Sequence, residues 1–396
     1  MTVLFLCVFL LATATGSIAV ANDGPDPSQL IDEIRIETNV PDLPAVNITI
    51  GEAKHLFIVD TGSAHSTFDL HLANYLGGQV PETQLRSKSG GERPSPMYNV
   101  SPGLSVAIGK VKLKCRGPFH CEDLSAINRN AEFAFSGILG MDMLQDFVLQ
   151  IDYDSQVIRL LRPMNDSPGT RLPLEIKQSC PYVLATYGDD LPAQFLVDTG
   201  ATIGCMKKDV FLELSADKAA SEVGSGFIPQ IGEPKRATTI VQLSSFSVGG
   251  FEHRGTRWNT ATYNSLGTNI LCRYLVTFDF AGKAIYLRKG RRFNAGTNWA
   301  SAGLELVVLR GAITVRIVDE RSPADVAGIA PGDHVVKIGE IPAEKTSVGK
   351  LRRMVSDARG ASLAITVERD GRLINRLMLI PPDVSGNCLP SLESQQ

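Results

Sequence analysis

The sequence predicts a mostly β protein in which two related halves are followed by a small α+β domain. Three observations support this prediction. The segments 57–62 and 195–200 each end an apolar run in Asp-Thr-Gly, and the two aspartates lie 138 positions apart. Short apolar stretches bounded by Gly, Pro and Asp indicate strands joined by tight turns. Beyond a basic connector at 290–300, the pattern changes to short strands interspersed with two helical segments.

Composition and charge restrict the class of protein. The 396 residues suit two or three domains, and 43% apolar with 20% charged residues is ordinary for a folded chain. The formal net charge of -3 shows no basic excess. We therefore expect no nucleic-acid partner and no polybasic membrane patch.

The N-terminus is typical of an export signal. An apolar run at 3–11 is followed by small residues up to an A-x-A cleavage pattern that ends at Ala21. Polar residues interrupt the stretch after this run, which favours a signal peptide at 1–21 over a membrane anchor. The sequence therefore predicts an exported chain, periplasmic or secreted, with no membrane span after signal cleavage.

Export changes how the cysteines are interpreted. Without Cys7, six of the seven cysteines remain, and the sequence leaves their pairing open. Cys115 and Cys121 are close enough in sequence to staple a local loop, and buried free thiols are the alternative for the others. No two cysteines have C-x-x-C spacing, so no metal site is expected, and no cofactor is predicted.

The first half is expected to alternate short strands with turns. A polar stretch at 87–98, rich in Gly and Pro, predicts either a mobile hairpin or an ordinary surface loop. The expected strands lie at 31–50, 55–60, 63–69, 100–114 and 147–161, with a short helix at 70–76 and turns at Gly109-Lys110 and Asp154-Ser155.

The second half repeats this order of features. The pair Ile138-Leu139 begins 78 positions after Asp60, and a similar pair, Ile270-Leu271, begins 72 positions after Asp198. Matching order with nearly matching spacing indicates an internal repeat. The further features expected here are a polar Gly-rich segment at 224–232, strands turning at Gly249-Gly250, and returning strands at 275–287.

The C-terminal part has the pattern of a separate small domain. Ser322, Pro323 and Gly328 have the order of a helix N-cap, first turn and end. The other expected elements are strands at 304–309, 313–318 and 334–338, a helix at 350–358, and a hairpin at 362–380 that turns at Asp370-Gly371.

Two carboxylates that meet can perform acid–base chemistry. Like charges a few ångströms apart cannot both ionise, so the pair shares one proton. One member can then accept a proton from water while the other polarises a carbonyl group. In each motif the Thr can hydrogen-bond to backbone across the interface, and the Gly lets the main chain approach the carboxylate. Asp60 and Asp198 are therefore the candidate catalytic residues, supported by Thr61, Gly62, Thr199 and Gly200.

Residues 30–290 resemble the aspartic proteases of the pepsin and retropepsin type. The resemblance rests on the two Asp-Thr-Gly motifs, each followed by an Ile-Leu pair and a returning strand. It implies two lobes of double-psi-type β-barrel fold, at 22–165 and 166–290, around a cleft that binds an extended polypeptide substrate. It also implies that the segments near 87–98 and 224–232 are flaps.

The second half departs from this family pattern at one position. Gly140 follows the first Ile-Leu pair, but Cys272 follows the second. The departure suggests either a local disulfide with Cys205 or a relaxed second lobe, and it puts the catalytic competence of that half in doubt.

Residues 300–382 resemble a PDZ domain, on the motif from Ser322 to Asp333. Members of this family bind peptide segments by strand addition. The binding loop would include Gly303, Leu304 and Leu306, and the residues 383–396 would form a flexible tail. The alternative is that the module only packs on the lobes.

The function that this sequence predicts is that of a hydrolase, an exported aspartic endopeptidase whose PDZ domain binds substrate or partner peptides. The alternative is a non-catalytic peptide-binding or scaffold protein that retains the protease fold. A homodimer that uses one motif per chain is made unnecessary by the second motif.

Overall fold

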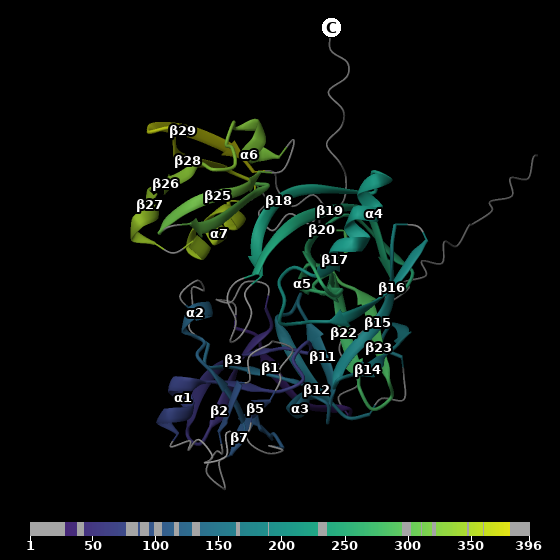
Figure 1. Cartoon of the computed structure of the whole chain (residues 1–396). Coiled ribbons are helices and arrows are strands. Elements are labelled where there is room, and N and C mark those ends of the chain that lie inside the picture. Colours follow the sequence, from purple (N-terminus) through teal and green to yellow (C-terminus); the bar gives the residue numbers. More distant parts are fainter. Residues whose placement is uncertain are drawn as a thin grey trace, which may run out of the picture.

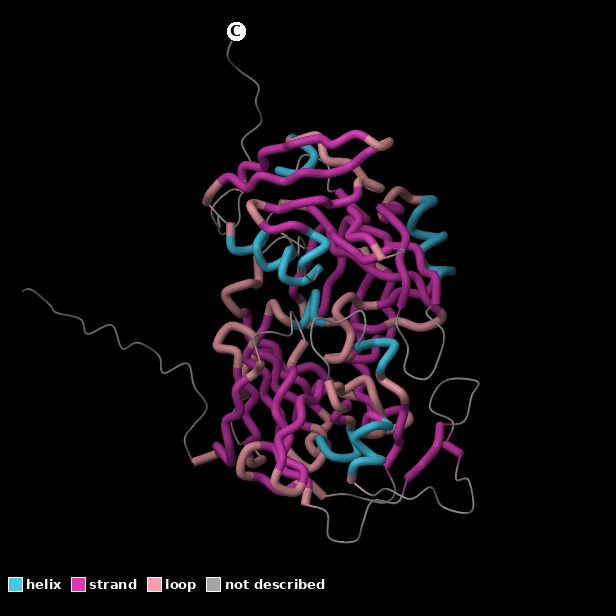
Figure 2. The backbone as a smooth tube through the Cα atoms, turned by 90° about the vertical axis from the view of Figure 1, so that its left-hand side faces the viewer, coloured by secondary structure: helices cyan, strands magenta, loops and turns pink. Residues whose placement is uncertain are grey.

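The computed structural model describes residues 28–37, 43–76, 86–87, 95–98, 105–114, 119–128, 135–163, 167–188, 190–228, 236–294, 302–309, 311–318, 322–346, 348–358 and 360–380. Strands dominate these residues, and the helices are short (Figures 1 and 2). The prediction of a mostly β protein is confirmed.

The first half is built on a nine-stranded sheet with the order β5-β6-β9-β4-β10-β3-β2-β7-β8. Its parallel pair β10–β3 places the end of β3 in the interior of the sheet. The strands are β2 (Ala45–Ile50), β3 (Ala53–Val59), β4 (Thr67–Asp69), β5 (Arg86–Ser87), β6 (Ser95–Tyr98), β7 (Val106–Ile108), β8 (Val111–Lys112), β9 (Phe119–Glu122) and β10 (Gly137–Leu139). The helices are α1 (Leu70–Tyr75), α2 (Ser125–Asn128) and α3 (Met141–Leu144).

The second half is built on an eight-stranded sheet with the order β14-β15-β16-β21-β17-β20-β19-β18. Two pairs are parallel in each sheet: β16–β21 corresponds to β3–β10 of the first half, and β17–β20 corresponds to β4–β9. The strands are β14 (Glu175–Lys177), β15 (Cys180–Tyr187), β16 (Leu191–Val197), β17 (Cys205–Lys207), β18 (Ala220–Ile228), β19 (Arg236–Val248), β20 (Phe251–Ala261) and β21 (Ser265–Leu266). The helices are α4 (Lys208–Ala216) and α5 (Thr268–Leu271).

A six-stranded sheet joins the two halves. At its centre β11 of the first half pairs with β22 of the second, and Gln150 donates a hydrogen bond to Thr277 across that pair at 3.0 Å. One apolar cluster continues from the first half through this sheet into the second. The strands, in spatial order, are β1 (Leu30–Arg35), β12 (Val157–Leu161), β11 (Val148–Asp152), β22 (Tyr274–Asp279), β23 (Ala284–Lys289) and β13 (Thr170–Pro173).

The C-terminal domain has its own sheet and its own apolar core. Its strand β25 lies against β18 of the second half (Figure 1). The sheet order is β24-β25-β26-β28-β29, and β27 pairs with β26. The elements are β24 (Leu304–Leu309), β25 (Ala312–Val318), α6 (Pro323–Val326), β26 (His334–Ile338), β27 (Ile341–Pro342), the 3-10 helix η1 (Ala343–Lys345), α7 (Val348–Asp357), β28 (Ser362–Arg369) and β29 (Arg372–Leu379).

The expected tight turns are present because their residues tolerate the left-handed backbone region. Gly249 and Gly250 have φ values of 63° and 77°, and Asp370 and Gly371 have 52° and 73°. The polar Gly-rich segment expected at 224–232 begins as a strand. The strand β18 continues to Ile228 because its backbone pairs with β19 through that residue.

Several predicted segments lie outside the described residues. These are the signal peptide at 1–21, the middle of the first expected flap at 88–94, the segment 229–232 and the tail at 383–396. Among the helices that the structure describes, none is long and apolar enough to cross a membrane. Cys121 and Cys205 are free thiols, so neither expected local disulfide is formed.

Candidate functional site

The two Asp-Thr-Gly motifs meet where β3 and β16 end. Each strand buries its last valine completely, and the following aspartate enters a turn between the halves. Gly62 donates its N–H to Asp60 Oδ1 at 2.8 Å, and Gly200 donates to Asp198 Oδ1 at 3.0 Å. Each carboxyl group is therefore fixed by its own turn, although each aspartate residue as a whole is only half-buried.

The two threonines cross between the halves. Thr61 Oγ1 donates to the carbonyl oxygen of Val197 at 2.6 Å, and Thr199 Oγ1 donates to that of Val59 at 2.7 Å. Each hydroxyl also accepts the backbone N–H of the opposite threonine, at 3.3 Å and 3.0 Å. Four buried hydrogen bonds therefore tie the two turns together.

The two glycines let each turn approach the opposite carboxyl group. A Cβ atom on Gly62 would lie 2.6 Å from Asp198 Cγ, and one on Gly200 would lie 2.3 Å from Asp60 Cγ. Both distances are shorter than any relaxed carbon–carbon contact. Glycine is therefore required at both positions for the carboxyl groups to meet.

A second loop passes behind each aspartate. The N–H of Asp60 donates to Leu139 O and that of Asp198 donates to Leu266 O, both at 3.0 Å. The residue after Leu139 is Gly140, and the residue after Leu266 is Gly267. The two glycines have nearly the same backbone conformation, with φ of -97° and -89°.

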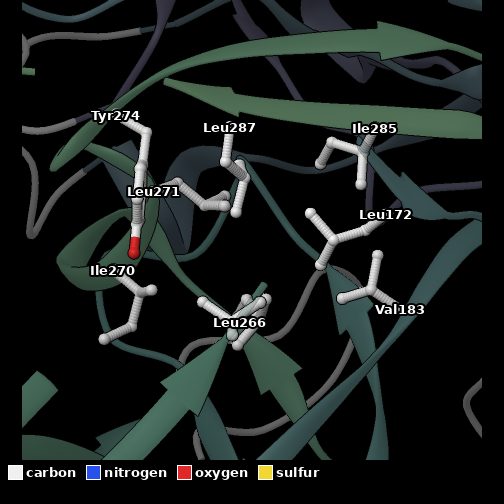
Figure 3. A pocket seen from close by; sticks show the side chains of 9 residues that line it. Leu172, Val183, Leu266, Ile270, Leu271, Tyr274, Ile285 and Leu287 are labelled. Atoms are coloured by element: carbon white, nitrogen blue, oxygen red, sulfur yellow. The ribbon is translucent and has the colours of Figure 1, made fainter. Parts of the chain in front are cut away.

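This loop corrects the sequence alignment of the two halves. The structural equivalent of Gly140 is Gly267, and Cys272 lies five positions further on, at the end of α5. Ile270 and Leu271 belong to α5 and line a small apolar cavity together with Leu266 (Figure 3). The doubt that Cys272 raised about the second half is therefore removed.

The sequence does contain a pattern that identifies Gly267 as the equivalent of Gly140. Residues 139–144 are Leu-Gly-Met-Asp-Met-Leu, and residues 266–271 are Leu-Gly-Thr-Asn-Ile-Leu. The polar residue of each segment has the same role in the structure. Asp142 Oδ1 accepts the N–H of Ser66 at 2.9 Å, and Asn269 Oδ1 accepts that of Gly204 at 3.0 Å.

The carboxyl groups of Asp60 and Asp198 form a hydrogen-bonded pair. Burial raises the pKa of both, and the charge of Asp60 raises the pKa of Asp198 further, well above its usual range. The N–H groups of Gly62, Ser63 and Gly200 and the Asp198 carboxyl act in the opposite direction on the pKa of Asp60. The two carboxyl groups therefore share one proton, and they titrate as a pair rather than as separate groups.

The structure thus brings together Asp60, Asp198 and their four predicted supporting residues. A group bound above the pair could receive a proton from the protonated carboxyl group and give one to the ionised carboxylate. The catalytic role of these residues remains a prediction.

The predicted binding loop of the C-terminal domain precedes and enters β24, at one edge of the sheet. Gly303 has a φ of 64°, which turns the chain into that strand. The side chains of Leu304 and Leu306 are buried in the domain core, and β24 contacts α7. Any peptide bound here would meet backbone groups of the strand rather than the full side chains of these leucines.

Comparison with known families identifies part of the chain. The family model of the PDZ domain matches residues 301–376. The prediction of a C-terminal PDZ domain is confirmed.

A curated relative is the "Probable periplasmic serine endoprotease DegP-like" of Rickettsia conorii (strain ATCC VR-613 / Malish 7). It is 34% identical over 110 residues, which is 25% of this chain and 21% of the relative. The chain thus spans about a fifth of the length of the curated relative that it matches.

The name of this relative contradicts the predicted enzyme class. It specifies a serine endoprotease, in which a hydroxyl group is the nucleophile, whereas the prediction was an aspartic endopeptidase that activates water between carboxyl groups. The predicted function, including its non-catalytic alternative, and the descriptions aspartyl protease and retropepsin-like are therefore withdrawn.

Proposed function

We propose that this chain is an exported protein that acts on polypeptides, with Asp60 and Asp198 as its proton-transferring pair and the PDZ domain as a peptide-binding module. Support for polypeptides as the partner comes from the PDZ domain and from the name of the relative. That name also supports export to the periplasm. The proposal assigns no catalytic class.

The observation that carries the site is the hydrogen bond between the two carboxyl groups. Buried pairs of this kind are rare in a purely structural role, because a carboxylate loses hydration when it is buried. Each motif also has a position where only glycine fits, and each has a buried threonine that helps to hold the two turns together. A folding role alone would not need this arrangement.

We further propose that each half has the double-psi β-barrel fold, with domain limits of 22–165 and 166–290. The support is the loop behind each aspartate, which pairs in parallel with the strand that carries the motif. The fold is proposed on this topology alone.

The test is peptide cleavage with two separate ways of blocking it. The full chain is incubated with a mixed peptide library between pH 3 and pH 8, and products are identified by mass spectrometry. Asp60→Asn and Asp198→Asn should each abolish cleavage, and labelling with a serine-reactive fluorophosphonate tests independently for a serine nucleophile. Cleavage that survives both substitutions, or a labelled serine with loss of cleavage, would remove the carboxyl pair from the reaction.

The PDZ domain is tested in the same protein by its own binding measurement. Labelled peptides with a free or an amidated C-terminus are titrated into the Asp198→Asn variant, which prevents turnover at the pair. We expect saturable binding of at least one set. Absence of binding for both sets would contradict the peptide-binding role of the domain.

A further inference from the structure

A thiol from the second half contacts the first Asp-Thr-Gly turn. Cys180 is the first residue of β15 and follows a tight turn at Gln178 and Ser179, which have φ values of 48° and 65°. Its Sγ donates a hydrogen bond to the carbonyl oxygen of Gly62 at 3.3 Å. The side chain is almost fully buried, with Cys180 8% exposed.

The carbonyl group of Gly62 and the N–H group of Ser63 belong to the same peptide unit. That N–H donates to the backbone carbonyl oxygen of Asp60 at 3.4 Å, which closes the turn in which the Gly62 N–H donates to Asp60 Oδ1 at 2.8 Å. A peptide unit is planar, so a bond that fixes the direction of its oxygen also fixes the direction of its N–H. Donation to the oxygen also polarises the unit and strengthens the bond that its N–H makes.

The state of the thiol suits a donor rather than a nucleophile. Burial, followed by the charges of Asp60 and Asp198, raises the pKa of Cys180 to about 12. The group therefore keeps its proton throughout the range in which the carboxyl groups titrate. Cys180 is also not part of a disulfide.

We propose that Cys180 is a positioning residue of the carboxyl pair, which holds the Gly62–Ser63 peptide and with it the turn whose Gly62 N–H binds Asp60 Oδ1. This inference deepens the proposed function, because it names a residue of the second half that orders the turn around Asp60. Its geometry can be tested without any substrate.

The test is a carbon-13 NMR titration of the two carboxyl groups, with Asp60→Asn and Asp198→Asn used to assign the signals. In Cys180→Ala, the apparent pKa of Asp60 should rise by on the order of 0.3 pH unit, about twofold in proton affinity. Cys180→Ser, which keeps a donor, should return it toward the wild-type value. If Cys180→Ala does not fold, Cys180→Val, which also lacks a donor, takes its place.

Other titrating groups near the pair do not interfere. Burial raises the pKa of Tyr153 well above its usual value and that of Cys205 to about 11, so both stay protonated below pH 8. The matched control is Cys121→Ala, which removes a buried thiol of the first half that contacts Phe119 O. It should leave the carboxyl titration unchanged.

An unchanged titration in Cys180→Ala, or equal titrations in the alanine and serine variants, would overturn the positioning role. The result is independent of the proposed function. A chain that cleaves no peptide but shows the shift retains this inference, whereas a chain that cleaves peptides without the shift loses this inference alone.

Discussion

Replacing Thr61 by valine should strongly destabilise the contact between the two halves. Valine has nearly the same shape, but it removes the hydrogen bond to Val197 O at 2.6 Å and the acceptor for the Thr199 N–H at 3.3 Å. Both backbone groups would then be buried without a partner. Each such group costs about 1–3 kcal/mol, so we expect the two to lower the free energy of unfolding by about 2–6 kcal/mol.

The assay is urea unfolding followed by tryptophan fluorescence, because Trp258 is fully buried in the second half. The matched control is Thr61→Ser, which keeps the hydroxyl group and loses only a methyl group, for a cost of about 1 kcal/mol. The reasoning is refuted if the valine variant is no less stable than the serine variant.

Three further predictions follow from the site and the PDZ domain. Gly200→Ala should reduce the proposed cleavage by on the order of a hundredfold, because the new Cβ would lie 2.3 Å from Asp60 Cγ and would separate the carboxyl groups. The raised pKa of Asp198 means that the folded chain holds a proton that the unfolded chain has released, so stability falls as pH rises through the folded-state pKa. Asp198→Asn should remove this loss of stability. The variant should therefore be more stable than wild type at neutral pH, but it should show no such advantage at about pH 4. Asp333→Asn should destabilise the PDZ domain by about 2 kcal/mol, because Asp333 makes two hydrogen bonds to Arg369, at 2.6 Å and 2.8 Å. The loss is expected to be no larger because Arg369 is partly exposed to solvent.

Each of these predictions has its own check. For the glycine, the control is Gly188→Ala, which adds the same methyl group in open space, at a backbone φ of 57°, so cleavage should persist. For Asp198→Asn, equal stability of the two proteins at every pH would contradict the raised pKa. For Asp333→Asn, calorimetric melting of the PDZ domain should show a lower Tm, and an unchanged Tm would show that the pair with Arg369 contributes little.

The features that local chemistry determines could be predicted from the sequence. The hairpin turns at Gly249-Gly250 and at Asp370-Gly371 depend on residues that tolerate positive φ, so composition is sufficient. The two aspartates could also be paired, because a repeat places equivalent residues at a shared interface.

Other features depend on contacts between distant segments. The strand β21 has only two residues, too few for a period-two pattern, so Gly267 was not recognised as the partner of Gly140. The contact of Cys180 with Gly62 spans 118 positions and leaves no local pattern. The raised pKa values of Asp60 and Asp198 follow first from the burial of both carboxyl groups between the halves, which the two motifs do not reveal.

The six-stranded sheet has a consequence for how the site comes into existence during folding. Each half contributes one carboxyl group, and β11 must pair with β22 before the two groups can meet. Titration of the pair is thus a reporter of docking between the halves, and partly folded chains should lack it. When the two halves are expressed separately, the raised pKa of Asp198 should be absent. It should return when the halves are mixed, in proportion to the fraction of halves that associate.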